Sequence, residues 1–142
     1  HLEPSPAEWE DISFGFKKAK VISKAGIGQT IIVKNLSVVA VEAAEGTDEA
    51  ISRAGRLARG CVVVKVAWQD QDKRFDIPTV GPDTIDVMLA AGARVLAIEA
   101  GRTIVVRRED TLAFADESQI PVVAVGEVEV LEHNDKRRRS VR

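Results

Sequence analysis

The middle of the chain carries the run Val62-Val63-Val64-Lys65-Val66-Ala67, in which β-branched valine dominates. Such a run lacks the alternation of apolar and polar residues that marks a strand with one wet face. It is typical of a strand that is buried on both faces. A strand of this kind needs paired neighbours and helices above and below it. The run therefore predicts the central strand of an α/β sheet.

Helical and strand patterns alternate on both sides of this run. Ser5 is a predicted N-cap, with Pro6 at the first helical position and Glu8 completing a capping box. Helices are predicted over residues 6–25, 47–59, 82–91 and 108–118, and strands over 30–34, 38–43, 95–98, 103–106 and 120–125. Turns at residues 35–37 and 100–102 would join neighbouring strands. The predicted fold class is α/β, with an at least partly parallel central sheet, flanking helices and one or two β-hairpins.

The composition predicts a soluble protein with one hydrophobic core and argues against a nucleic-acid partner. A chain of 142 residues suits a single domain. A formal charge of -2 and 4% aromatic residues offer neither a basic face nor a stacking platform for bases. The single cysteine, Cys61, excludes an internal disulfide and a cysteine metal cluster, and we expect it in the core. No apolar run is long enough to cross a membrane.

The two ends of the chain carry separate expectations. The chain starts at His1 and not at Met, so we expect it to be part of a longer protein. Residues 1–126 are predicted to form the domain. Val128 and Val130 are predicted to extend a sheet edge, ahead of a basic tail over residues 133–142. Such a tail is either disordered or weakly attracted to an anionic membrane surface.

The first polar constellation lies between a predicted strand and a predicted helix, and contains Glu45, Gly46, Thr47 and Asp48. Thr47 is a candidate N-cap, and acids suit the positive end of a helix. That local role explains these residues without any ligand. Alternatively, the acids hold a cation that carries a phosphate.

The second constellation is the unpatterned segment after the valine run. It offers the carboxylates Asp70, Asp72 and Asp76, with the cations Lys65, Lys73 and Arg74 nearby. Carboxylates suit Mg²⁺ or Mn²⁺, and Lys and Arg suit phosphate oxygens. This combination is what hydrolysis of a phosphoanhydride requires, although a solvated charged loop has the same composition. Both constellations follow predicted strands, so we expect them to face one cleft.

Several stretches resemble one protein family in order along residues 9–126. They are Asp11-Ile12-Ser13-Phe14-Gly15-Phe16, Gly28-Gln29-Thr30, Val41-Glu42-Ala43, Glu45-Gly46-Thr47-Asp48-Glu49-Ala50-Ile51, Lys65-Val66-Ala67, Arg74-Phe75-Asp76-Ile77-Pro78-Thr79-Val80-Gly81, Ala91-Gly92-Ala93 and Glu99-Ala100-Gly101-Arg102-Thr103. Together they resemble the C-terminal domain of the UDP-2,3-diacylglucosamine pyrophosphatases that are not calcineurin-like. Trp68, where a small or basic residue is expected, and the tail after Gly126 depart from the family pattern.

The resemblance implies a metal-dependent hydrolase that uses Mg²⁺ or Mn²⁺ at the cytosolic face of the bacterial inner membrane. Its products would be UMP and lipid X, an intermediate of lipid A biosynthesis. Asp76 matches the family's essential acid and is the expected metal ligand. The expected substrate-binding residues are Glu45, Gly46, Thr47, Asp48, Lys65, Gln71, Asp72, Arg74 and Thr79. The expected partners are UDP-2,3-diacylglucosamine and an N-terminal domain that this chain lacks, and a homodimer is also expected.

Two other functions remain open at this point. The domain alone could bind lipid X or the nucleotide without chemistry. It could also serve only for dimerisation, through an apolar first helix that carries Trp9 and Phe16.

Overall fold

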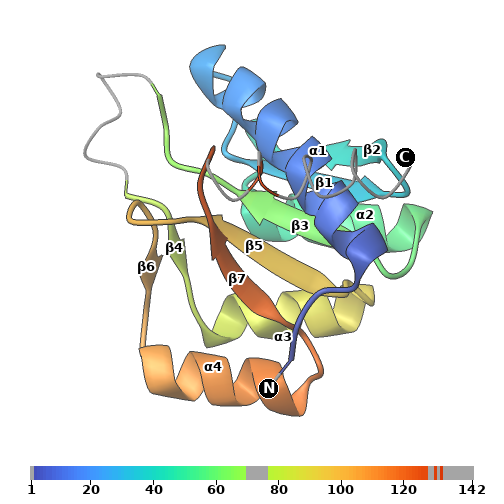
Figure 1. Ribbon diagram of the computed structural model, residues 1–142, viewed down its shortest axis with the longest axis vertical. Helices are drawn as coiled ribbons and strands as arrows, with labels where there is room; N and C mark the ends of the chain where they lie inside the picture. Colours follow the sequence, from blue (N-terminus) through green and yellow to red (C-terminus); the bar gives the residue numbers. More distant parts are fainter. Residues whose placement is uncertain (1, 70–76, 128–129, 131, 133–142) are drawn as a thin grey trace.

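The computed structural model describes residues 2–69, 77–127, 130 and 132. Within them it contains four helices and seven strands (Figure 1). In chain order these are α1 (Pro6–Lys24), β1 (Thr30–Lys34), β2 (Ser37–Val41), α2 (Thr47–Leu57), β3 (Val62–Lys65), β4 (Thr79–Val80), α3 (Pro82–Ala91), β5 (Val95–Glu99), β6 (Ile104–Val105), α4 (Arg108–Glu117) and β7 (Val122–Val125).

The main sheet has the strand order β2-β1-β3-β5-β7, so the valine strand β3 is its centre. β3, β5 and β7 run parallel, whereas β1 is antiparallel to both β2 and β3. The mixed sheet confirms the predicted α/β class and the hairpin at residues 35–37. Asn35 and Leu36 both have positive φ in that turn, 50° and 59°.

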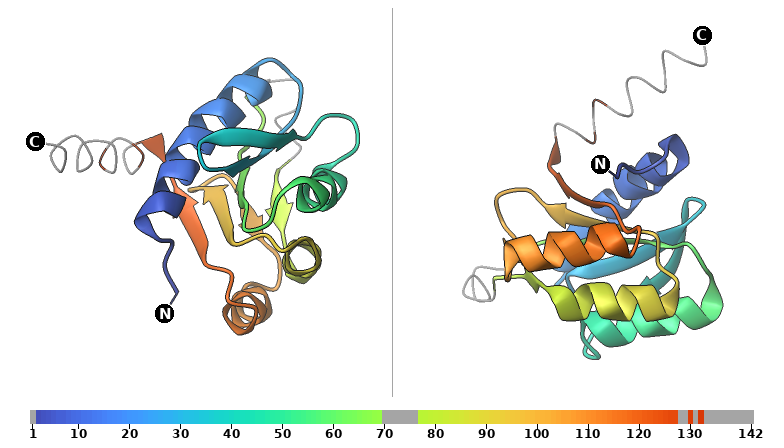
Figure 2. Two further views of the ribbon diagram at one scale, coloured as in Figure 1. Left: turned by 90° about the vertical axis from the view of Figure 1, so that its right-hand side faces the viewer. Right: turned by 90° about the horizontal axis from the view of Figure 1, so that it is seen from below.

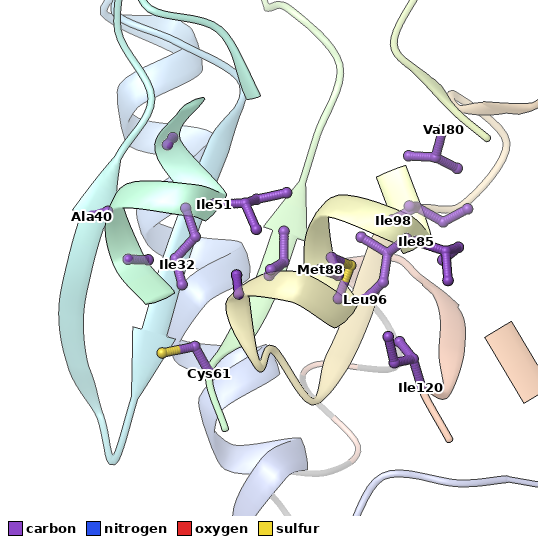
Figure 3. Close-up of a cluster of buried hydrophobic side chains, with 14 of the residues drawn as sticks. Ile32, Ala40, Ile51, Cys61, Val80, Ile85, Met88, Leu96, Ile98 and Ile120 are labelled. Carbon is purple, nitrogen blue, oxygen red and sulfur yellow. The ribbon is translucent and has the colours of Figure 1, made fainter. Parts of the chain in front are cut away.

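Helices cover both faces of the sheet, as the valine run predicted. α1 covers one face, and α2, α3 and α4 cover the other (Figure 2). Val62 and Val64 pack with Ile12 and Phe16 of α1, while Val63 packs in the opposite cluster. Figure 3 shows that second cluster, which contains Ile51, Met88, Leu96 and Cys61. Cys61 is therefore a core residue, as expected, and burial raises the pKa of its thiol.

The start and end of α1 follow the local sequence signals. The Ser5 side chain accepts a hydrogen bond from the backbone N–H of Glu8, whose carboxylate accepts one from the N–H of Ser5. At the other end Gly26 has a φ of 72°, and the N–H of Ile27 donates to the carbonyl of Ile22. A capping box and a left-handed glycine thus define the helix.

Two strand expectations are wrong. β5 and β6 do not form a hairpin, because β6 pairs in parallel with β4 in a separate two-stranded sheet. Residues 95–99 already have partners on both sides in the main sheet, so β6 must find its partner elsewhere. Val130 is not in a strand either. Its N–H donates to the carbonyl of Gly126, which is a helical contact, and its side chain is buried against the α1 side of the sheet. Val128 lies outside the described residues.

Helices α2 and α3 touch at a glycine. A Cβ at Gly55 would lie 2.7 Å from the carbonyl oxygen of Ala91 and 2.8 Å from its Cα. These are backbone atoms, which a rotamer change cannot move. The close approach of the two helices therefore depends on the missing side chain.

We predict that Gly55→Ala lowers the free energy of unfolding by about 1–3 kcal/mol through overpacking. Helix propensity alone has the opposite sign, since alanine is favoured over glycine by about 1 kcal/mol. Urea unfolding followed by circular dichroism measures the difference. Leu57→Ala, at a side chain that is 65% exposed in the same helix, is the control and should change stability little. A Gly55→Ala protein as stable as the wild type would contradict this account of the helix contact.

Candidate functional site

Polar side chains gather where the parallel strands end. β3, β5 and β7 point their carboxyl ends to one edge of the sheet. Because β1 is antiparallel to β3, it begins at the same edge, and Thr30 pairs with Lys65. β2 ends there as well and leads through Glu42 to the start of α2. We call the residues at this edge the strand-end cluster: Gln29, Thr30, Glu42, Thr47, Lys65 and Thr79.

Glu42 organises one half of the cluster. It is only 5% exposed, and its carboxylate accepts a hydrogen bond from the Thr47 hydroxyl. The other carboxylate oxygen accepts from the backbone N–H of Gln29 at 3.2 Å. The Thr47 hydroxyl also lies 3.1 Å from the Thr30 hydroxyl. The buried carboxylate thus joins the ends of β1 and β2 to the start of α2.

Thr47 is not the N-cap that the sequence suggested. Gly46 holds that position with a φ of 91°, and α2 has no side-chain cap. A left-handed backbone favours glycine there. Thr47 is the first helical residue, and its hydroxyl donates to the Glu42 carboxylate.

Gly28 allows this arrangement because it packs directly against the backbone of Glu42. A Cβ at Gly28 would lie 2.8 Å from the carbonyl carbon of Glu42. Steric contact with Glu42 therefore explains why position 28 of the Gly28-Gln29-Thr30 segment is a glycine. It lets β1 begin close enough for Gln29 to reach the carboxylate.

Lys65 dominates the other half of the cluster. It is 9% exposed at the end of β3, and its Nζ donates to the carbonyl of Thr79 at 3.0 Å. Burial lowers the pKa of Lys65, while the negative charges of Glu42 and Asp48 act in the opposite direction. An ammonium has three N–H donors, so the bond to Thr79 leaves capacity for an anion.

Apart from Gly46, the N-cap of α2, the predicted substrate-binding residues divide into three groups. Thr47, Lys65 and Thr79 belong to the strand-end cluster. Asp48 belongs with them electrostatically, because its negative charge acts to raise the pKa of Lys65. Glu45 is engaged elsewhere: it forms an exposed ion pair with Arg53, and the hydrogen bond from that guanidinium lowers its pKa. Arg53 also donates to the carbonyl of Val41 at 3.0 Å, which ties the loop to α2. The third group, Gln71, Asp72 and Arg74, lies outside the described residues, as does the predicted catalytic residue Asp76.

Sequence reasoning named neither Glu42 nor Gln29 as a site residue. The Nε2 atom of Gln29 is buried and has no hydrogen-bond partner in the part of the chain that the structure describes. An available signal was the presence of polar residues directly beside apolar strands at positions 29, 30 and 42. Only the sheet register shows that they meet, because they come from different strands.

The described residues supply few ligands for a metal. Among residues 2–69 and 77–127, no group of three or more His, Cys, Asp or Glu side chains could hold an ion. Both carboxylate oxygens of Glu42 already accept hydrogen bonds. Asp70, Asp72 and Asp76 lie outside this part of the chain, so the expected Mg²⁺ or Mn²⁺ stays a prediction. In the same described part, every helix is too short or too polar to cross a bilayer.

Three comparisons place this geometry among known proteins. The model of the LpxI C-terminal domain family matches residues 1–123. The UDP-2,3-diacylglucosamine pyrophosphatase LpxI of Caulobacter vibrioides is 36% identical over 133 residues, which cover 87% of this chain and 48% of that protein. This chain thus spans about half the length of that curated relative. The Acinetobacter baumannii RibD structure, form 2, is similar in fold alone, with 12% identity, a TM-score of 0.50, and coverage of 90% of this chain and 39% of that one.

The lowered pKa of Lys65 predicts how stability depends on pH. Between the folded-state pKa and the ordinary value of 10.5, the unfolded chain binds more protons than the folded one. The free energy of unfolding therefore gains a contribution that rises with pH through this window. Lys65→Met removes that contribution. Urea unfolding of both proteins between neutral pH and pH 10.5 measures the free energy of unfolding. The value for the wild type minus the value for the variant should increase with pH. A difference that is constant or falls with pH would contradict the burial of a charged lysine.

Proposed function

Because this chain belongs to the LpxI C-terminal domain family, we propose that it is the C-terminal domain of a UDP-2,3-diacylglucosamine pyrophosphatase. Water would attack the pyrophosphate of the UDP-sugar lipid and release UMP and 2,3-diacylglucosamine 1-phosphate, which is lipid X. This is a step of lipid A biosynthesis. The observation that carries the proposal is the 36% identity to a pyrophosphatase of this name.

The strand-end cluster supports the proposal chemically. A phosphoanhydride needs positive charge and hydrogen-bond donors where negative charge develops on the phosphate oxygens. Lys65 supplies a nearly buried cation, and its electrostatic effect is larger there than in water. Its bond to Thr79 holds the ammonium in one place before substrate arrives. We assign Lys65 and Arg74 to the phosphates, and Asp76 to the attacking water.

A bound Mg²⁺ or Mn²⁺ would neutralise phosphate charge and lower the pKa of a bound water. Asp76 is our candidate ligand. Thr47, Asp48, Gln71 and Asp72 are proposed to border the substrate. Glu45 and Gly46 are also proposed to border the substrate, and the carboxylate of Glu45 pairs with Arg53.

The substrate is proposed to lie between this domain and an N-terminal domain, since this chain spans 48% of its relative. Because substrate and product carry acyl chains, we propose that the protein works peripherally at the cytosolic face of the inner membrane. A homodimer stays a prediction, but not through Phe16. That side chain is 2% exposed and packs in the core of its own chain.

Release of UMP from UDP-2,3-diacylglucosamine, measured with the full-length protein and with this chain alone, tests the function. We expect turnover by the full-length protein and almost none by the chain, since half of the cleft would be missing. A chelator should stop turnover, and added Mg²⁺ or Mn²⁺ should restore it. Binding of substrate without turnover by the full-length protein would instead identify a binding module. Equal rates for the two proteins would place the whole site in this chain.

We predict that Asp76→Ala in the full-length protein abolishes hydrolysis, with fold and much of the substrate binding retained. A carboxylate can accept the proton of the attacking water or ligate the metal, and alanine can do neither. Asp76→Asn separates these roles in part, because an amide oxygen can ligate weakly but is no base. Arg74→Ala should raise KM and lower kcat together if the guanidinium clamps a phosphate.

Steady-state hydrolysis and circular dichroism measure these variants. The simpler alternative is a local pair of Asp76 with Arg74 or Lys73, which at an exposed position contributes about 0–1 kcal/mol. Its loss would leave activity nearly unchanged. A folded Asp76→Ala protein with most of the wild-type rate would therefore remove Asp76 from the catalytic role.

A further inference from the structure

The second half of α1 is basic, whereas its first half is acidic. Four lysines lie between positions 17 and 24, and the sequence from residue 12 to residue 41 contains no Asp or Glu. The first half of the helix instead contains Glu8, Glu10 and Asp11. The helix dipole favours a cation in the last turn, which is where Lys24 lies. It does not explain the lysines of the preceding turns.

The solvent side of this basic half is centred on an apolar residue. Val21 is 64% exposed. Lys17 and Lys18 precede it by four and three residues, and Lys24 follows it by three, so all of them neighbour Val21 on the helix surface. The three lysines are exposed as well. A single exposed valine is ordinary, but a valine framed by three cations makes the surface amphipathic.

Two large side chains extend this surface beyond the end of the helix. Ile27 is 48% exposed. Trp68 is partly exposed, and the residues on either side of it are hydrogen-bonded to the Ser23 side chain of α1. The N–H of Val66 donates to the carbonyl of Gln29 at 2.8 Å, so Ile27 and Trp68 each lie two residues from the same backbone hydrogen bond. We call the exposed residues of this region the basic-apolar surface: Lys17, Lys18, Val21, Lys24, Ile27 and Trp68.

The basic-apolar surface borders the strand-end cluster. Ser23 donates to the carbonyl of Ala67, which follows Lys65 by two residues. Lys20, on the same half of α1, forms an ion pair with Glu99 at the end of β5. α1 alone covers this face of the sheet, so the outer side of the helix is open to a partner (Figure 2).

The charge of this region is positive in the part of the chain that the structure describes. Glu99 is almost completely buried and pairs with Lys20. Glu127 shares with Lys17 and Lys20 a shallow groove of about 310 Å³. These are the two carboxylates that lie beside the four lysines, which leaves the exposed surface attractive to anions.

We propose that the basic-apolar surface docks the protein on a bilayer that contains anionic phospholipids. The inference rests on the proposed function, because a substrate with acyl chains resides in a bilayer. Each lysine near such a membrane strengthens binding several-fold. Val21, Ile27 and Trp68 can enter the boundary between head groups and acyl chains. Docking by this surface places the strand-end cluster, with Lys65, beside the membrane that supplies the substrate.

Vesicle binding by the full-length protein tests this surface. The probes are vesicles of phosphatidylcholine alone and vesicles in which phosphatidylglycerol replaces part of it. We expect the wild type to float with the anionic vesicles at low salt, to ignore the neutral ones, and to dissociate as salt is added. Lys17→Gln/Lys24→Gln should weaken binding about 10- to 30-fold. Val21→Ser should weaken it about fivefold through lost apolar burial.

Matched substitutions on the opposite face of the sheet are the controls. Arg56→Gln/Arg108→Gln also removes two exposed cations, one from α2 and one from α4. Leu57→Ser changes an apolar side chain that is 65% exposed, as Val21 nearly is. Both controls should bind anionic vesicles as the wild type does. A protein that ends at residue 132 lacks the basic tail and should also keep its binding.

UMP release gives a second readout that separates docking from chemistry. With substrate embedded in anionic vesicles, Lys17→Gln/Lys24→Gln should raise KM about 10- to 30-fold, in line with its weaker binding. With substrate dispersed in a neutral detergent, the same variant should turn over at the wild-type rate. Failure of the proposed function looks different, because the wild type would then release no UMP from either form of substrate.

Four results would overturn the proposal. The wild type could fail to bind anionic vesicles, or Lys17→Gln/Lys24→Gln could bind them as well as the wild type. The control Arg56→Gln/Arg108→Gln could lose as much binding as the lysine variant, or removal of residues 133–142 could abolish binding while the surface is intact. Sedimentation velocity checks the rival occupant. If Val21→Ser dissociates a dimer and leaves vesicle binding unchanged, the surface is an interface between copies and not a membrane contact.

Discussion

β3 is paired on both edges and covered on both faces, and this double burial governs the rest of the structure. Water cannot reach the polar groups of such a strand, so each must find a partner in the protein. Within β3 the neighbours β1 and β5 provide these partners. Beyond it strand pairing ends, but Val66 and Ala67 are still buried. Ser23, Glu99 and the carbonyl of Gln29 provide partners for the backbone there, and the carbonyl of Thr79 accepts one of the three N–H bonds that Lys65 can donate.

The same constraint explains why the polar residues of this domain concentrate at one edge of the sheet. Parallel strands bring their carboxyl ends together, and the antiparallel β1 brings its first residues to the same place. Residues that are 13 to 17 positions apart in sequence thereby become neighbours, as Gln29 and Glu42 or Thr30 and Thr47 do. Ligand sites of α/β sheets commonly lie at this edge. Under the proposed function, a substrate with two phosphates would bind at this edge.

Local rules in the sequence predicted the elements well where burial or capping decides them. The valine run placed β3 at the centre, and Ser5, Pro6 and Glu8 located the start of α1. The predicted structure was wrong where a residue from another element determines the local structure. Residues 104–105 are strand only because β4 lies beside them, and Thr47 is turned from the helix cap by Glu42. Glu42 itself could not be recognised as a site residue from its sequence neighbours, because its contacts are with Gln29 and Thr47.

Three ionisable residues, Glu42, Lys65 and Glu99, are each less than 10% exposed at this edge. Moving such groups out of water is costly, and apolar replacements of similar size are often neutral or stabilising. Stability alone therefore gives little reason to keep charges here. The proposed hydrolysis of a phosphoanhydride would give one, because that reaction needs a fixed cation and fixed carboxylates in a site with little water. The two glutamates have distinct parts in that arrangement: Glu42 anchors the start of β1 and α2, and Glu99 anchors the exit from β3. Lys65 lies on β3 between these two anchored regions, and under the proposed function it would interact with the substrate.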